Sequence, residues 1–222
     1  MLHTEGPMRP SPLTTQADLT FTDYFKLNLD IEEVLAYFGY TFQSITMTLP
    51  KSSEHIVWFD DLHERMQASL PYISLTSEAA RREFLIAPIL IDLARYNHVK
   101  VKVEFPIDVS DQLRGTLDYF IQASQNLLVI EAKNADLQRG FTQLSAELIA
   151  LDQWLDTDAP ILYGAVSIGN VWQFGRLNRF EKHIQQDLNL YRVPADLYDL
   201  LQILLAVLGE DQQNQGTEGN PR

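Results

Sequence analysis

The stretch Leu117–Lys133, LDYFIQASQNLLVIEAK, constrains the fold of this chain more than any other. It contains two runs of apolar, aromatic and β-branched residues separated by the short polar link Ala123–Asn126, which is the pattern of two strands joined as a hairpin. Each run also carries one acid, Asp118 in the first and Glu131 in the second. A strand buried in a sheet disfavours a charged side chain unless that charge is paired or binds a cation, so the two acids require an explanation.

The simplest hairpin around this link pairs Asp118 with Glu131 and Phe120 with Val129 across the two strands. Directly opposed residues have Cβ atoms about 4.5–5.5 Å apart, where two carboxylates repel each other. A shared proton, a neighbouring Lys or Arg, or a hard cation would offset this repulsion. Because side chains alternate between the two faces of a strand, Lys133 is expected on the same face as Glu131.

Carboxylates that converge from two strands suit Mg²⁺, which binds proteins through one or two carboxylates together with water and phosphate oxygens. Beside such a metal, Lys133 could orient a water molecule or stabilise the charge that builds on a phosphate during cleavage. The alternative is a structural ion pair in which Lys133 only neutralises the acids, an arrangement that adds little stability when it is buried. The residues therefore favour half of a metal-dependent site for phosphodiester cleavage.

The same residues resemble the signature of a known superfamily. Asp118, followed after twelve intervening residues by Glu131-Ala132-Lys133, is similar to the motif of the PD-(D/E)XK nucleases, which have the restriction-endonuclease-like fold. Leu117 stands where the name of the motif has proline, a position that varies widely. The segment SEAARREFLIAPIL resembles the helix that opens this core in the nuclease regions of type I restriction enzymes and their stand-alone relatives, and YGAVSIGNVWQF resembles the strands that follow. The resemblance covers roughly Thr76 to Leu208.

The resemblance implies roles for individual residues. Glu78 matches an early glutamate that joins the site, with Glu83 as the second choice, and Gln143 matches a glutamine on the helix after the lysine strand. The implied metal ligands are Asp118, Glu131, the carbonyl of Ala132 and Glu78, and the implied catalytic residues are Asp118, Glu131, Lys133, Glu78 and Gln143. Lys133 would position the attacking water, and Gln143 would orient the lysine or the substrate phosphate. The implied function is hydrolysis of DNA with Mg²⁺, for which Mn²⁺ can substitute, by a homodimer.

Hydrophobic periods predict an α/β (mixed α+β) chain with a mixed central sheet flanked by helices, and the resemblance implies a restriction-endonuclease-like core. From Thr76 onward the expected order of elements is α-β-β-β-α-β-β-α. The expected parts are a flexible tail (1–17), an N-terminal α/β extension packed on the core (18–75), the core (76–208) and a disordered tail (209–222).

Several elements carry clear local signals. Ser77 is expected to cap the first core helix, which Pro88 interrupts, and Gly169-Asn170 predicts a two-residue hairpin turn. Upstream, IEEVLAYFGY and HIVWFDDLHERMQASL predict helices and TFQSITMTL a strand, and near the end VPADLYDLLQILLAVL predicts a closing helix. The long helix after Lys133 has one narrow apolar stripe, formed by Leu137, Phe141, Leu144, Leu148, Leu151 and Leu155.

Composition limits the function classes. The net charge of −13 argues against a strongly basic, non-specific nucleic-acid binder, although residues 78–182 contribute only about −3 of it. The chain has no cysteine, which excludes a thiolate zinc site and a cysteine nucleophile. Neither a secretory signal nor a membrane-spanning run is expected, since the most apolar run, LLQILLAVL, is too short. These observations predict a cytoplasmic protein without a membrane partner.

A second hypothesis keeps the fold but assigns a binding or regulatory protein with weak or no catalysis, acting through a protein or nucleic-acid partner. The acidic charge favours it, and so do residues 1–75, which lie outside the resemblance and could hold a partner protein. A third hypothesis pairs Asp118 and Glu131 separately with basic residues on the surface, without a metal.

Overall fold

The computed structural model describes residue 13 and residues 18–123, 127–131 and 136–209, with residues 127–131 described as backbone. The predicted tails, 1–17 and 209–222, lie outside these ranges except for Leu13 and Gly209. Leu13 is buried, and its carbonyl oxygen accepts a hydrogen bond of 2.9 Å from Gln112 Nε2.

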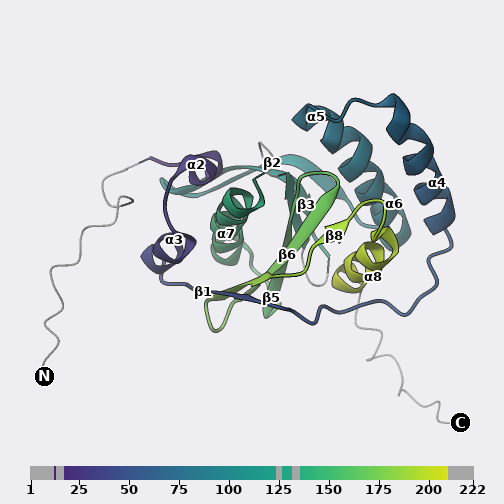
Figure 1. Cartoon of the computed structure of the whole chain (residues 1–222). Coiled ribbons are helices and arrows are strands. Elements are labelled where there is room, and N and C mark those ends of the chain that lie inside the picture. The colour runs from purple at the N-terminus through teal and green to yellow at the C-terminus, as the bar shows by residue number, and fades with distance from the viewer. Residues whose placement is uncertain (1–12, 14–17, 124–126, 132–135, 210–222) are drawn as a thin grey trace, which may run out of the picture.

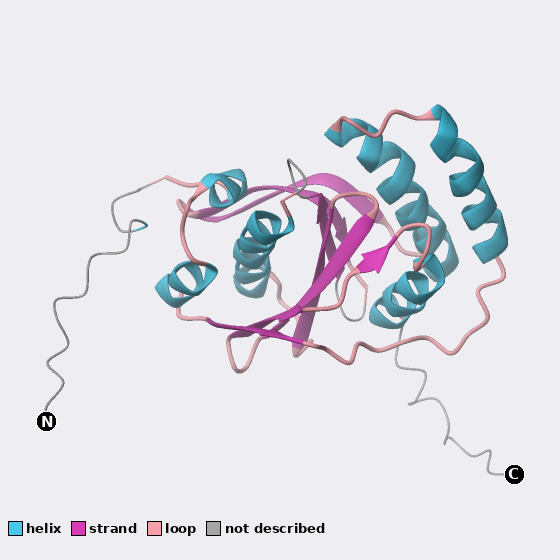
Figure 2. Ribbon diagram, viewed as in Figure 1, coloured by secondary structure: helices cyan, strands magenta, loops and turns pink. Residues whose placement is uncertain are grey.

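The described strands form one mixed sheet, shown in magenta in Figure 2. In chain order they are β1 (Thr41–Ile45), β2 (Val101–Ser110), β3 (Leu113–Ile121), β4 (Leu127–Glu131), β5 (Ile161–Ser167), β6 (Val171–Asn178), β7 (His183–Asp187) and β8 (Tyr191–Arg192). The order across the sheet is β1-β7-β6-β5-β4-β3-β2, and β8 pairs with β6 beside this row. β1 is parallel to β7 and β4 is parallel to β5, whereas the other neighbours are antiparallel. The predicted mixed sheet is confirmed.

Helices cover both faces of this sheet (Figure 1): α2, α3 and α7 lie on one side, and α4, α5, α6 and α8 on the other. Their bounds are α2 (Phe21–Lys26), α3 (Ile31–Tyr37), α4 (Phe59–Ser69), α5 (Glu78–Arg81), α6 (Ala87–Asn97), α7 (Leu137–Trp154) and α8 (Leu197–Leu208). A 3₁₀ turn (Leu70–Tyr72) follows α4, and a π-helical turn (Arg82–Ile86) joins α5 to α6. The mixed α+β class with a helix-flanked sheet is confirmed. None of the described helices is both long and apolar enough to cross a membrane.

The local signals in the sequence act as predicted. Ser77 caps α5, because its Oγ accepts a hydrogen bond of 3.1 Å from the backbone N–H of Ala80. Pro88 lacks a backbone N–H, and in a regular helix its ring would clash with the carbonyl four residues earlier. The wider π-helical turn Arg82–Ile86, directly before α6, makes room for the proline ring. Gly169, with φ of +92°, forms the turn between β5 and β6 together with Asn170.

Two strands were not predicted. β7 (His183–Asp187) and β8 (Tyr191–Arg192) complete the sheet next to β6, and β1 pairs in parallel with β7. The sequence of β7, HIQQD, is mostly polar and short, so its apolar alternation is weak. The last helix also begins at Leu197, later than the predicted start near Pro194.

The central helix α7 is buried on every side, since all of residues 140–151 are buried. Its apolar stripe rests on glycines of the sheet. A Cβ on Gly164 of β5 would lie 2.6 Å from Leu144 Cδ1, and a Cβ on Gly175 of β6 would lie 2.5 Å from Phe141 Cζ. α2 and α3 pack against α7 from the side away from the sheet (Figure 1). The N-terminal segment therefore forms part of the enclosure of this helix.

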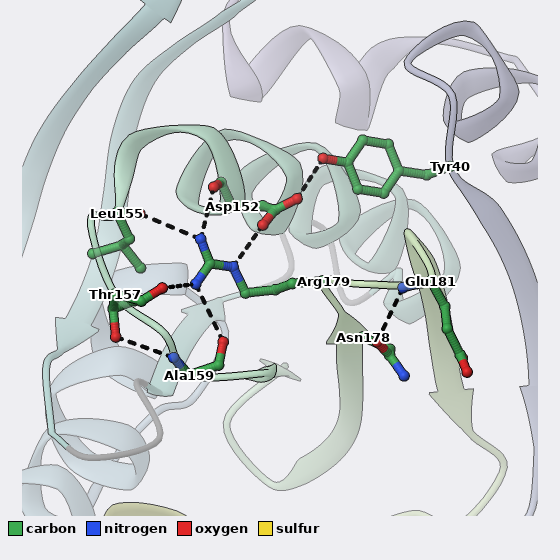
Figure 3. Close-up of polar contacts among 8 residues, drawn as sticks. All are labelled: Tyr40, Asp152, Leu155, Thr157, Ala159, Asn178, Arg179 and Glu181. Atoms are coloured by element: carbon green, nitrogen blue, oxygen red, sulfur yellow. Dashed lines mark hydrogen bonds and ion pairs between the residues drawn. The ribbon is translucent and has the colours of Figure 1, made fainter.

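Arg179, at the end of β6, holds the C-terminal end of α7 (Figure 3). Its Nε donates to Asp152 Oδ1 at 2.6 Å, and its two terminal nitrogens donate to four backbone carbonyls, those of Asp152, Leu155, Thr157 and Ala159. Asp152 Oδ2 in turn accepts from the Tyr40 hydroxyl at 2.6 Å. Burial, and then the hydrogen bond to Asp152, raise the pKa of the Tyr40 phenol above its ordinary value. One guanidinium thus ties together α7, β6 and the segment before β1.

We expect Arg179→Ala to lower the free energy of unfolding by about 3–5 kcal/mol, because it leaves the Asp152 carboxylate, whose side chain is only 12% exposed, without its cation. Arg192→Ala is the matched control: Arg192 also pairs with an aspartate, Asp196, but its side chain is 69% exposed. That control should leave the free energy of unfolding nearly unchanged, because exposed ion pairs contribute little. Urea denaturation measures both, and equal losses in the two variants would contradict the expectation.

Asp23 closes the start of α2 in a capping box with Thr20. Its Oδ2 accepts from the Thr20 hydroxyl at 2.6 Å and from the Thr20 backbone N–H at 3.0 Å, while Lys26 lies 3.1 Å from Oδ1. The Thr20 hydrogen bonds, with a smaller effect from Lys26, lower the pKa of Asp23 to about 2.

Because the folded protein binds fewer protons at Asp23 than the unfolded chain does, part of its stability should disappear as the pH falls from about 4 to about 2. In Asp23→Asn this part of the acid dependence should be absent, whereas Lys26→Met should keep most of it. Unfolding free energies measured across this pH range decide the matter, and an unchanged acid dependence in Asp23→Asn would refute the assignment.

Candidate functional site

Asp118 lies in β3, opposite an acid that was not predicted. The β2–β3 ladder pairs Val103 with Tyr119 and Phe105 with Leu117, which places Glu104 opposite Asp118 between these two pairs. Glu104 also lies 3.6 Å from Arg82 in an ion pair. The candidate site therefore includes an acid on the edge strand β2, Glu104, one strand further out than the sequence indicated.

The backbone is irregular at this point. Glu104 has a φ of +50°, a left-handed conformation that a non-glycine residue rarely adopts. Lys102 Nζ lies 4.5 Å from the ring centre of Phe105. In a regular strand, residues three apart point to opposite faces, so this contact marks a break in the alternation. Such irregularities bend a strand and redirect its side chains next to functional sites.

The predicted register of the β3–β4 hairpin is wrong by one residue. Phe120 pairs with Leu128 instead of Val129, and the described ladder ends at Tyr119 and Val129. The connection spans residues 122–126 instead of the four-residue link, because Gln122 leaves the ladder. Continued along the strands, this register would put Glu131 opposite Leu117 and Asp118 opposite Ile130, so regular alternation would place positions 118 and 131 on opposite faces of the sheet.

The first core helix lies against the same end of the sheet. Glu131 pairs with Ser167, the last residue of β5. The turn that follows β5 touches α5, because a Cβ on Gly169 would lie 2.9 Å from Arg81 Cβ. Glu78 is the first residue of α5 and is half-buried. Glu78 stands four residues before Arg82, whose side chain reaches Glu104. The backbone positions of Asp118, Glu131 and Glu78 thus lie toward the same end of the sheet.

Glu83, the second choice at the Glu78 position, is exposed in the π-helical turn. Ala132 and Lys133 lie outside the described residues, so their places in the site stay predictions. Among the residues whose side chains the structure describes, no three acids or histidines form a group that could hold a metal ion; Glu131 is not among them.

Gln143 approaches from the other face of the sheet, on α7. The next residue, Leu144, rests on Gly164 of β5, and Gly164 pairs with Leu128 of β4. Gln143 is 4% exposed, and its Nε2 donates a hydrogen bond of 2.9 Å to Oε1 of Glu147, which is fully buried. The glutamine is therefore part of a buried polar pair, which the sequence did not indicate.

Comparison with known proteins does not assign this site, since the chain matches no family model, no curated protein and no solved structure. Glu104 and Glu147 are the two described residues that sequence reasoning missed. Glu104 occupies a normal polar position in the alternation VKVEFPIDV, so only strand pairing reveals it. Glu147 occupies a polar position beside the apolar stripe, so only the enclosure of α7 on every side explains its burial.

The strain at Glu104 makes a prediction about stability. Glu104→Gly should leave the free energy of unfolding unchanged or raise it by up to about 1 kcal/mol, because glycine adopts positive φ without a steric penalty. Lys102→Gly on the same strand should lower it by about 1 kcal/mol, since Lys102 has no such strain to relieve. Chemical denaturation measures both values. Calorimetry with Mn²⁺ then shows whether Glu104 contributes to metal binding, in which case Glu104→Gly weakens the affinity and Lys102→Gly does not.

Proposed function

We propose that this chain is a Mg²⁺-dependent endonuclease that hydrolyses phosphodiester bonds in DNA, built on a restriction-endonuclease-like core. The observation that supports the proposal is that Asp118 and Glu131 belong to the neighbouring strands β3 and β4, near the same end of the sheet. Two carboxylates in this arrangement, with Glu78 on the covering helix, are the kind of oxygen ligands that Mg²⁺ takes.

The topology supports the same proposal. α5 and α6 lead into the antiparallel strands β2, β3 and β4, and α7 then crosses to β5, which is parallel to β4. This α-β-β-β-α-β path is the order that the resemblance to PD-(D/E)XK nucleases implies. The additional strands β6, β7, β8 and β1 extend the sheet on the side away from β2.

Hydrolysis forms a bond from a water oxygen to phosphorus while the bond from phosphorus to one ester oxygen breaks and that oxygen gains a proton. Asp118, Glu131, the carbonyl of Ala132 and Glu78 would hold the metal, which supplies charge stabilisation to the phosphate and activates the water. Lys133 would position the attacking water, with Gln143 as its neighbour. Mn²⁺ should replace Mg²⁺, since both take oxygen ligands in octahedral geometry.

The decisive experiment incubates the purified chain with supercoiled DNA and Mg²⁺ or Mn²⁺. We expect metal-dependent nicking by the native chain and a loss of about 100-fold or more in both Lys133→Ala and Glu131→Gln, because each removes a participant in the chemical step. Lys182→Ala serves as the control, since Lys182 lies over the ring of Tyr40, in the turn between β6 and β7.

Nicking that survives both Lys133→Ala and Glu131→Gln would show that another site or another protein is responsible. A chain that binds Mn²⁺ by calorimetry without nicking DNA would be a metal-binding relative and not an active nuclease. Size-exclusion chromatography with light scattering tests the homodimer that the superfamily implies. The cytoplasmic location predicted from the composition stays a prediction.

One observation favours the second function, a binding or regulatory protein that acts through a partner. Most described arginines already pair with acids: Arg65, Arg82, Arg95, Arg114, Arg139, Arg179 and Arg192. Together with the net charge of −13, this leaves few cations for DNA phosphates. A DNA affinity that falls steeply with salt would support the nuclease, whereas a shallow dependence would favour a protein partner, for which residues 1–75 offer the surface outside the core.

A further inference from the structure

The two edge strands of the described sheet differ in how well they are protected against pairing with another chain. β2, at one edge, contains Pro106, Lys102 and the irregular backbone at Glu104, which are features that natural proteins use to block such pairing. β1, at the other edge, has the sequence TFQSI, with no proline and no charge. Its register with β7 is unbroken from Thr41 to Ile45. β1 is therefore a regular edge strand without the usual protection.

Half of the backbone groups of β1 point away from the sheet (Figure 1). The Thr41 N–H donates to the Lys182 carbonyl at 2.9 Å, and the Ile45 carbonyl accepts from the Leu188 N–H at 2.9 Å. Residues that bond to one neighbouring strand alternate along a ladder, so the N–H and C=O groups of the intervening residues Phe42 and Ser44 face outward. These groups form a template to which a further strand can bond.

A hollow of about 440 Å³ lies beside this edge, on the face of the sheet that α7 covers. Phe42 and Ser44 line it from β1, and the two leucines that follow β7, Leu188 and Leu190, line it from another side. These leucines are 58% and 48% exposed, whereas the Phe42 ring packs against that of Phe141 with centres 6.1 Å apart. The hollow thus offers an apolar contact to the side chains of a strand that adds to β1.

The rim of this hollow is acidic. Asp30 and Glu32, at the start of α3, line it, and both are exposed and form no ion pair with any residue that the structure describes. The described part of the lining contains no lysine, arginine or histidine. Two copies paired through β1 would bring the same acids together, and the net charge of −13 would add to their repulsion. Charge complementarity therefore favours a basic partner over a second copy of this chain.

We propose that β1 and the hollow form a docking site for an extended segment of a partner protein, one that carries both apolar and basic side chains and adds a strand to the sheet. Main-chain hydrogen bonds to Phe42 and Ser44 supply affinity, and the leucines and acids of the hollow select the side chains. The site is independent of the proposed nuclease reaction, because none of its residues belongs to the candidate metal site.

The test begins with a displayed library of random linear peptides, selected for binding to the native chain. We expect the enriched peptides to share apolar residues and lysine or arginine. The most enriched peptide is then synthesised, and fluorescence polarisation measures its affinity. Ser44→Pro should weaken binding about tenfold, because it removes an outward N–H that the fold does not use. Ser44→Ala is the matched control: it keeps this N–H, loses only the hydroxyl bonded to Gln186 at 2.9 Å, and should bind as the native chain does.

The acids of the rim provide a second pair of variants. Glu32→Gln should weaken the same peptide about threefold and make its binding less dependent on salt, because an exposed charge contributes modestly and is screened. Glu33→Gln is the control, since Glu33 is also exposed on α3 but does not line the hollow, and it should leave the affinity unchanged. Equal effects of the two substitutions would overturn the role of the rim.

Circular dichroism and thermal melting show whether each variant is folded. Should Ser44→Pro fail to fold, hydrogen exchange in the native chain replaces it: the peptide should slow exchange of the Phe42 and Ser44 amides, and that of Gln43 much less, because Gln43 already bonds to β7. A library without enriched peptides, a peptide that binds Ser44→Pro as tightly as the native chain, or unchanged exchange at Phe42 and Ser44 would overturn the docking site. A dimer in light scattering that Ser44→Pro dissociates would assign the edge to a second copy and overturn the partner.

Discussion

The contact of α7 with the glycines of β5 and β6 is the constraint on which the rest of the structure depends. Leu144 and Phe141 occupy the space that side chains at Gly164 and Gly175 would fill, so the helix lies unusually close to the sheet. Each fully buried side chain of this size stabilises the fold by about 1.5–3 kcal/mol. Because α7 begins at Leu137, soon after β4 ends at Glu131, the same contact also fixes where its first turns lie relative to β3 and β4.

A second, opposing constraint is the irregularity at Glu104. A left-handed non-glycine residue costs about 1–2 kcal/mol, and the ion pair with Arg82 offsets little of this because Glu104 is 66% exposed. The conformation is therefore held by its neighbours, with Phe105 stacked on Phe120 and Tyr119 buried on the other face. Backbone strain that persists in this way is typical of positions where geometry serves a site. Here it lies directly opposite Asp118.

The sequence predicted those parts of the fold that depend on local signals. The apolar stripe of α7, the Ser77 cap and the Gly169-Asn170 turn each follow from residues close together in the chain. The hairpin register could not be predicted, because nothing in the polar link shows that Gln122 leaves the ladder and shifts every pair by one residue. Likewise β7 is too polar to be recognised without its neighbours β6 and β1.

The candidate site shows the same division. Asp118 and Glu131 were singled out from their spacing and Glu78 from the resemblance, whereas the place of Glu104 depends on strand pairing and the burial of Glu147 on contacts between distant segments. α2 and α3, more than a hundred residues earlier in the chain, pack against α7, and together with the sheet they bury residues 140–151 of this helix on every side. In such an enclosure the hydrogen bond between Gln143 and Glu147 is stronger than it would be in water, because the local dielectric is lower. The burial of this polar pair therefore depends on distant segments of the chain, which the sequence around α7 does not reveal.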